Sequence, residues 1–191
     1  SVLAGARTDL QHQGVALKQR PDTVQYRLLL FSQACENNKG PILEVLSRVF
    51  AGRRRVLEIG SGIGTMIERM ATGPLEHRSS QYTAVDINPD CTRAARRRLS
   101  RWAKRQGFVV IRETETSHLL ETGGTRIRVD LKTGDAYALV AEAAPHSWDL
   151  LLAHAFMDLV DIQSLLPGMM RLLKSGGLLF LSLNFDGDTV M

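Results

Sequence analysis

An apolar run that leads straight into a glycine-rich loop is the feature that most limits how this chain folds. Residues 55–60, RVLEIG, have the character of a buried strand, and Gly60, Gly62 and Gly64 follow at alternate positions. Glycines let the backbone turn sharply and approach a ligand closely. A helix predicted around residues 65–70 would direct free N–H groups toward an anionic ligand. The stretch therefore predicts a strand–loop–helix unit suited to a nucleotide cofactor, although such a loop alone is a weak signal.

Strand and helix patterns alternate along the rest of the chain. Buried strands are predicted at residues 82–87, 125–131, 148–156 and 177–185. Helices are predicted between them, at residues 89–106, 135–144 and 161–174. Alternation of this kind is typical of a parallel sheet with helices on both faces. We therefore predict an α/β fold, a three-layer α-β-α sandwich around a mainly parallel, twisted sheet.

One segment does not fit this alternation. Residues 108–124 are too many for a direct connection between a helix and the next strand. Residues 108–112 (FVVIR), at the start of this segment, are predicted to pair with residues 125–129 (TRIRV), which follow it. The turn between them would contain Gly123 and Gly124. The resulting hairpin would extend one edge of the sheet.

Two helices are predicted ahead of the first strand. Asp22 begins one of them, with Gln25 completing a capping box, and Pro41 opens the other. Residues 1–51 are interpreted as an N-terminal arm and two helices that cover the cofactor site. Residues 52–191 form the cofactor-binding part. A length of 191 residues suits one compact domain overall.

Composition predicts a soluble protein of the cytoplasm. Hydrophobic residues make up 44% and charged residues 23% of the chain, and no apolar run reaches the roughly 20 residues of a membrane span. No signal-peptide pattern is visible at the start. Cys35 and Cys91 suit a reducing compartment and cannot form a CxxC-type metal site. We therefore expect a cytoplasmic protein with no membrane association and no metal.

Acidic residues at the ends of successive strands indicate the type of cofactor. The loop has the spacing E-x-G-x-G-x-G beginning at Glu58, and Thr65 stands where a dinucleotide-binding loop has its third glycine. Asp86 ends the second predicted strand, where it can accept hydrogen bonds from ribose hydroxyls or simply terminate the strand. Asp135 ends the third, where it can accept from an adenine amino group or cap the next helix. These carboxylates meet at the edge where open α/β sheets bind ligands.

Several motifs, taken in order, resemble those of one known family. They are VLEIGSGIGT (56–65), AVDINPD (84–90), TGDA (133–136), WDLLLAHAFMDLVD (148–161) and LLKSGGLLFLSLN (172–184). The family is the class I S-adenosylmethionine (SAM)-dependent methyltransferases, and the resemblance covers roughly residues 53–185. It implies a Rossmann-like SAM-binding domain whose strands lie in the spatial order 3-2-1-4-5.

The sequence departs from the family pattern after the fifth strand. The family's sheet usually ends in an antiparallel hairpin, whereas this sequence ends at NFDGDTVM, residues 184–191. Either the C-terminal part of the family's sheet is missing from this sequence, or the edge of the sheet is covered in another way. An exposed fifth strand is prone to edge pairing, and a homodimer is one way to cover it.

The resemblance implies a set of residues around SAM and its product, S-adenosylhomocysteine. Each is expected near one part of the cofactor: Gly60, Ser61, Gly62 and Gly64 at the methionine and ribose, Glu58 at the methionine ammonium, Asp86 at the ribose hydroxyls, Ile87 on an adenine face, Asp135 and the backbone of Ala136 at the adenine edge, and Ala153 and His154 at the methionine end.

The same motifs suggest the class of acceptor. Enzymes that methylate amino groups of bases or of glutamine typically have [D/N]PP[Y/F/W] after the fourth strand, and this chain has AHAF (153–156). This difference favours a small-molecule acceptor, methylated on oxygen, nitrogen or carbon. His154 is the candidate general base, and its alternative role is a structural hydrogen bond. In the leader, Tyr26, Arg27 and Phe31 are candidate lining residues of the acceptor pocket.

Other functions are not excluded by the sequence. Basic residues gather between Thr92 and Gly107 without an acid among them: Arg93, Arg96, Arg97, Arg98, Arg101, Lys104 and Arg105. A solvated helix face accounts for them, but they also suit an RNA partner, as in a tRNA-modifying methyltransferase. A non-catalytic SAM-binding domain is a further alternative, and a nicotinamide-dependent oxidoreductase is the least favoured.

Overall fold

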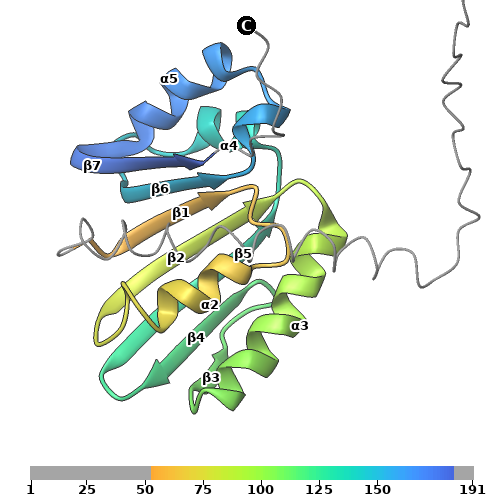
Figure 1. Ribbon diagram of the computed structural model, residues 1–191, viewed down its shortest axis with the longest axis vertical. Helices are drawn as coiled ribbons and strands as arrows, with labels where there is room; N and C mark the ends of the chain where they lie inside the picture. The colour runs from red at the N-terminus through yellow and green to blue at the C-terminus, as the bar shows by residue number, and fades with distance from the viewer. Residues whose placement is uncertain (1–52, 183–191) are drawn as a thin grey trace, which may run out of the picture.

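The computed structural model describes residues 53–182, which form an alternating series of strands and helices (Figure 1). The strands are β1 (Arg55–Ile59), β2 (Ser79–Asp86), β3 (Val109–Arg112), β4 (Ser117–Thr122), β5 (Thr125–Thr133), β6 (Trp148–His154) and β7 (Leu173–Ser182). The helices are α2 (Thr65–Ala71), α3 (Pro89–Arg105), α4 (Ala136–Glu142), α5 (Ile162–Leu172) and the short 3-10 helix η1 (Met157–Leu159). The predicted arm, the two leader helices and the C-terminal tail lie outside the described residues.

The strands form one sheet in the order β3-β4-β5-β2-β1-β6-β7. The pairs β5–β2, β2–β1, β1–β6 and β6–β7 are parallel. These are the five strands expected from the sequence, and their spatial order is the predicted 3-2-1-4-5. The predicted α/β class is therefore confirmed. The differences are two added strands at the β5 edge and an earlier start of β7, at Leu173.

The predicted hairpin partner at that edge is wrong. Residues 108–112 were expected to pair with residues 125–129, but β3 pairs with β4, and it is β4 that forms the antiparallel hairpin with β5 across Gly123 and Gly124. The reason is local: a two-residue turn joins the segments directly before and after it, so β4 takes the place beside β5. Its Ser117–Leu120 stretch is buried, and no strand was predicted there from the sequence.

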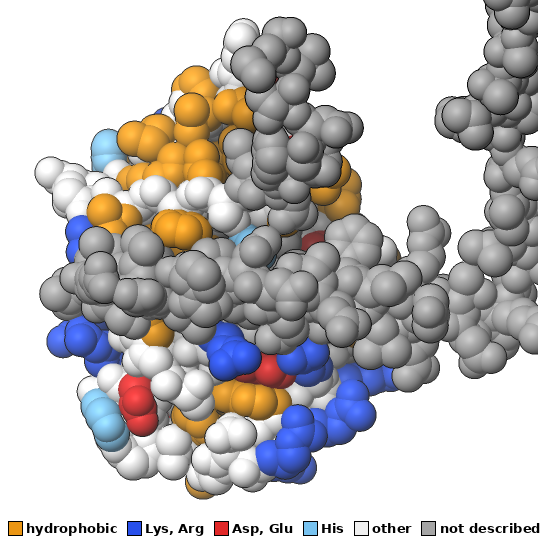
Figure 2. Space-filling view, viewed as in Figure 1, with side chains coloured by type: hydrophobic (Ala, Val, Ile, Leu, Met, Phe, Trp, Pro, Cys, Tyr) orange, Lys and Arg blue, Asp and Glu red, His pale blue; other side chains and the backbone are white. Residues whose placement is uncertain are grey.

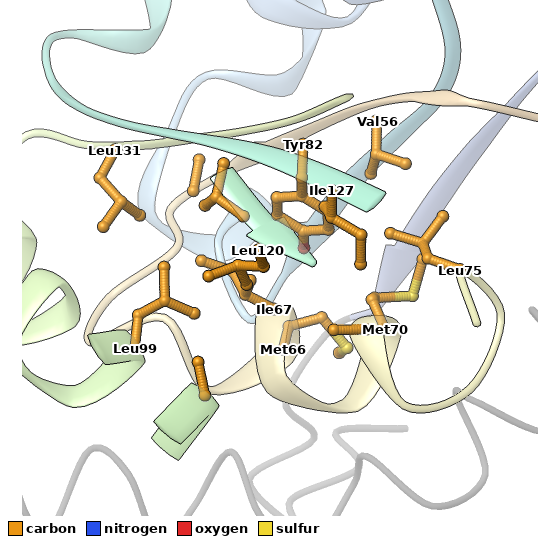
Figure 3. Packing of buried hydrophobic residues seen from close by; sticks show 14 of the residues in the cluster. Val56, Met66, Ile67, Met70, Leu75, Tyr82, Leu99, Leu120, Ile127 and Leu131 are labelled. Carbon is orange, nitrogen blue, oxygen red and sulfur yellow. The ribbon is translucent and has the colours of Figure 1, made fainter. Parts of the chain in front are cut away.

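The sheet separates two hydrophobic cores. Strand β1 contributes to both because side chains alternate along a strand: Val56 faces α2 and α3, whereas Leu57 faces α4 and α5. Figure 3 shows part of the first core, which includes Met70 of α2 and Tyr82 of β2. Tyr82 is fully buried. The helices thus form a layer on each side of the sheet, which completes the predicted three-layer sandwich.

Helix α3 follows β2 and leads away from the carboxyl edge of the sheet. Asn88 caps it by accepting a 2.9 Å hydrogen bond from the Asp90 N–H, and Pro89 occupies its first turn. Its inner face is buried, including Leu99 and Trp102, and its outer face carries the arginine-rich sequence. Arg98 does not belong to this outer face, because its guanidinium donates two hydrogen bonds, of 2.7 and 2.9 Å, to the carboxylate of Glu68 in α2.

Helices α4 and α5 are packed closely on the opposite face. A Cβ atom on Gly168 would lie 2.0 Å from Val140 Cγ1, so this α5 position admits no side chain without a shift. Arg171 donates to the Val140 carbonyl at 2.5 Å, which satisfies an acceptor near the end of α4. Among the helices of residues 53–182, none has the length and apolar character needed to cross a bilayer.

Candidate cofactor site

The glycine loop after β1 is bound to the end of β2. The N–H groups of Gly60 and Ser61 both donate to the Val85 carbonyl, at 2.9 and 3.1 Å. Gly60, Gly62 and Gly64 have φ angles of +73°, +53° and +74°, which side-chain-bearing residues rarely adopt. The alternating glycines of the sequence are therefore explained by the backbone conformation itself.

The three glycines differ in what surrounds them. A Cβ on Gly60 would lie 2.7 Å from Cδ2 of Phe156, and one on Gly64 would lie 3.1 Å from Cβ of Ala95. A Cβ on Gly62 would meet no atom of residues 53–182 within 4 Å. Gly60 and Gly64 thus allow close packing within the described part of the protein, whereas none of that part covers the backbone at Gly62.

Asp86 joins the glycine loop to the start of α3. Its Oδ2 accepts a 2.7 Å hydrogen bond from the Gly62 N–H, and its Oδ1 accepts a 2.8 Å bond from the Asn88 N–H. A carboxylate offers about four acceptor positions, so each oxygen keeps capacity for one more donor. The half-buried carboxylate is held in place and can accept from two adjacent hydroxyls.

Asp135 serves as the N-cap of α4. Its Oδ1 accepts from the N–H groups of Tyr137 (2.9 Å) and Ala138 (3.0 Å), which confirms the capping alternative. Its Oδ2 accepts no hydrogen bond from the described residues, and neither does the Ala136 N–H donate one to them. The exposed strand end therefore presents an acceptor beside a donor, the pattern that matches the amino group and ring nitrogen of adenine.

Ile87 follows Asp86 directly and is 70% exposed. A large apolar side chain in that position gains free energy when a flat apolar surface covers it. The strand ends of β2 and β5 are also joined, since the Gly134 N–H donates to the Asp86 carbonyl at 3.0 Å. Ile87 and Asp135 thus follow two strands that are directly bonded at this edge.

Glu58 lies deeper than the sequence suggested. It is only 4% exposed, and its Oε2 accepts a 2.8 Å hydrogen bond from the hydroxyl of Tyr82. Burial, followed by the charge and hydrogen bond of Glu58, raises the pKa of Tyr82 well above its ordinary value. Tyr82 therefore stays protonated and acts as the donor. The sequence did not indicate that Tyr82 donates to Glu58, because Tyr82 is there only one residue of a predicted buried strand.

The end of β6 contains the last two predicted residues. Ala153 is fully buried among the core residues beneath α4 and α5, so its side chain presents no accessible surface to a ligand. Nδ1 of His154 is hydrogen-bonded to Oγ of Ser182 in β7, which is its register partner. This is the structural role that the sequence analysis gave as the alternative. The loop that follows brings Phe156 onto Gly60, a contact that the sequence did not indicate.

The fold is that of the class I SAM-dependent methyltransferases. The chain belongs to the family described as "Protein of unknown function (DUF938)", whose model matches residues 30–189. No curated protein matches the sequence.

Solved structures share the fold at low sequence identity. A candidate SAM-dependent methyltransferase from Methanococcus maripaludis has a TM-score of 0.54 and 18% identity, and the match covers 75% of this chain and 54% of that one. A methyltransferase from Geobacter sulfurreducens has a TM-score of 0.53 and 20% identity, over 87% of this chain and 71% of that one. An arsenic(III) SAM methyltransferase from Chlamydomonas reinhardtii has a TM-score of 0.50 and 22% identity, over 66% and 38%. This chain therefore spans about half the length of the Methanococcus protein.

Proposed function

We propose that this protein is a methyltransferase that uses SAM to methylate a small molecule. The observation that supports the proposal most directly is the carboxylate of Asp86, which Gly62 and Asn88 hold with one acceptor position left on each oxygen. A ribose presents two neighbouring hydroxyl donors, and a carboxylate held in this way is matched to them.

The neighbouring residues account for the rest of a nucleoside. Ile87 would cover one adenine face, while Asp135 Oδ2 and the Ala136 N–H would pair with the adenine edge. Within residues 53–182, the space at Gly62 is open and leaves room for the part of SAM beyond the ribose. Glu58 is buried, so we propose that it acts on the methionine end mainly by shaping the loop and its field. Each of these groups binds or orients the donor without taking part in bond formation.

Bound SAM would supply an electrophilic methyl group on a sulfonium. The acceptor would form a bond to that carbon as the carbon–sulfur bond breaks, the electron pair would stay on sulfur, and the product would be S-adenosylhomocysteine. The protein has to align the acceptor for in-line displacement. We propose His154 as the group that takes a proton from acceptors that retain one at neutral pH, because it ends β6 beside the glycine loop.

Calorimetry with S-adenosylhomocysteine tests the donor site. The wild-type protein is expected to bind in the micromolar range, and Asp86→Ala is expected to weaken binding at least about tenfold, the loss of roughly one charge-assisted hydrogen bond. Glu142→Gln is a matched control, because this exposed residue ends α4, seven residues beyond the Asp135 cap. No binding by the wild type, or equal losses in both variants, would refute the proposal.

A labelled-SAM assay separates the three functions. Label in small metabolites of a cell extract is expected, label in tRNA would replace the proposal by the RNA-modifying alternative, and binding without any transfer would replace it by a non-catalytic SAM-binding domain. The exposed arginines of α3 are the structural feature that favours the RNA alternative over the non-catalytic one.

A further inference from the structure

A pocket lies away from the glycine loop, between the outer face of α3 and the β3–β4 hairpin. It is open to solvent and has a volume of about 420 Å³. Its lining residues are Arg93, Arg96, Arg97, Ser100, Arg112, Glu115 and His118. Figure 2 shows Lys and Arg side chains gathered over the part of the surface where α3 lies. The pocket exists because of the added β3 and β4 strands, which supply its second wall.

The lining has a strong excess of positive charge. Arg93, Arg96 and Arg97 share one face of α3 through i, i+3 and i, i+4 spacing, and Arg112 approaches from β3. Glu115 is the single carboxylate in the lining and lies 3.7 Å from Arg112, and Arg93 pairs with Asp90 outside the lining at 2.5 Å. Among the described residues, Arg96 and Arg97 therefore carry the unpaired charge of the pocket. Like charges brought together on a helix face are unfavourable. The arrangement is therefore stabilised when an anion enters.

Backbone carbonyls orient two of these guanidinium groups. Arg96 donates to the carbonyls of Glu115 (3.2 Å) and Thr92 (3.4 Å), and Arg112 donates to that of Thr114 (3.2 Å). A guanidinium has five N–H donors, so most donors of each remain available. Carbonyls alone fix the position of Arg96 and leave its charge unneutralised, whereas Arg112 is also paired with Glu115.

One lining residue, His118, is buried, and one of its ring nitrogens has no hydrogen-bond partner among the described residues. His118 is 5% exposed, and its Nδ1 has no hydrogen-bond partner within residues 53–182. Burial and the charges of Arg112 and Arg96 lower the pKa of His118, which keeps its ring neutral. A buried polar atom left without a partner is unfavourable. The buried ring is an observation independent of the arginines, and His118 lines the same pocket.

The pocket is separate from the place where methyl transfer is proposed. His118 is on β4 and His154 is on β6, and strands β5, β2 and β1 lie between them in the sheet. Four strand spacings amount to roughly 19 Å. A small molecule in the pocket would therefore not be the methyl acceptor.

We propose that this pocket binds a phosphate-bearing anion. Arginine forks match the paired oxygens of a phosphate, and several guanidinium groups around one space suit a ligand that carries more than one negative charge. The volume is sufficient for a diphosphate. The site does not depend on methyl transfer, so it can be tested whether or not the protein is an enzyme.

Calorimetry with inorganic pyrophosphate at low ionic strength, on the full chain, provides the test. The double variant Arg97→Gln, Arg112→Gln removes donors from both walls, and binding is expected to weaken at least about tenfold. Arg101→Gln, Arg105→Gln removes the same charge from exposed positions of α3 outside the lining, and a change below about twofold is expected. Binding of S-adenosylhomocysteine should be unchanged in both double variants, which also shows that each is folded.

Nitrogen NMR of the His118 ring locates the bound anion. Pyrophosphate is expected to shift the His118 ring resonances, which are assigned with a His118→Gln variant. A single-stranded oligonucleotide tests whether a polymer binds at the same place. Displacement of the oligonucleotide by pyrophosphate, with binding of both weakened by Arg97→Gln, Arg112→Gln, supports the proposal. Absence of pyrophosphate binding, equal losses in the two double variants, or unshifted His118 resonances would each overturn it.

Discussion

The hydroxyl of Tyr82 donates a 2.8 Å hydrogen bond to Oε2 of Glu58, and both side chains are buried where β1 and β2 lie side by side. A carboxylate at 4% exposure depends on such donors, because burial without them is strongly unfavourable. The pair therefore links the stability of the domain to the residue that precedes the glycine loop.

Removing this donor should destabilise the protein. Tyr82→Phe is expected to lower the free energy of unfolding by about 1–3 kcal/mol, measured by urea denaturation, because Glu58 loses a buried hydrogen bond. Tyr137→Phe is the matched control, since Tyr137 is 40% exposed and its hydroxyl takes part in a solvent-exposed hydrogen bond, accepted from the Asp161 N–H at 3.0 Å. Equal effects of the two substitutions would contradict the assignment.

Tyr82 also predicts how stability changes in alkali. Its pKa is raised in the folded state, so the unfolded chain loses the tyrosine proton first as the pH rises above about 10. The stabilising effect is complete below that pH and is lost above it. Stability of the wild type should therefore fall between pH 10 and 11 more steeply than that of Tyr82→Phe, and parallel profiles would refute the prediction.

Alanine substitutions in the glycine loop separate the effect of side-chain packing from the effect of backbone strain. Gly62→Ala should destabilise by about 1–2 kcal/mol, because alanine is strained at φ +53° while its methyl group meets no atom of residues 53–182. Gly60→Ala should lose about 1–3 kcal/mol more, because its methyl group would clash with Phe156. Adding Phe156→Ala should recover part of the Gly60→Ala loss in a double-mutant cycle. Strict additivity would show that the two residues do not touch.

Cys91 should be an unreactive thiol. Burial, together with the charges of Asp86 and Asp90, raises its pKa from 9.0 to about 11. At pH 8 roughly one thousandth is thiolate, so alkylation by iodoacetamide in a Cys35→Ser background should be far slower than that of the unfolded chain. Asp90→Asn removes a negative charge and should lower the pKa and speed the reaction. The pKa shift stabilises the fold below pH 9, and this contribution is lost as the pH rises to about 11.

The contact between α4 and α5 should not tolerate a methyl group. Gly168→Ala is expected to lower the melting temperature, with a loss of about 1–3 kcal/mol, because Val140 is β-branched and has few alternative rotamers. Gln163→Ala, at an exposed site of the same helix, should change stability by less than about 0.5 kcal/mol. Wild-type stability in Gly168→Ala would mean that the helices separate easily.

The parallel core could be predicted because its strands are short apolar or alternating runs, and the first two end at Gly60 and Asp86, so each pattern lies within a few neighbouring positions. The pairing of β3 with β4 could not, because FVVIR and TRIRV are equally plausible strands, and only the buried Ser117–Leu120 stretch between them decides the order. Local sequence identifies strands more readily than it identifies their partners.

The candidate site shows the same division. Asp86 and Asp135 could be found because the end of a strand is visible in the sequence. The contacts of Tyr82 with Glu58 and of Phe156 with Gly60 join residues 24 and 96 positions apart, so no local pattern contains them. The face of the sheet to which the Glu58 side chain points could have been predicted, because side chains alternate along a strand and Val56 and Glu58 therefore share a face.

The hydrogen bonds that join the ends of β1, β2 and β5 have a consequence for how this edge opens. Gly60 and Ser61 donate to Val85, and Gly134 donates to Asp86, so no one of these loops can detach without breaking a bond to its neighbour strand. Their amide hydrogens should therefore exchange with solvent together, at the slow rate of the central sheet. A ligand held at this edge would lengthen the lifetime of all three strands at once.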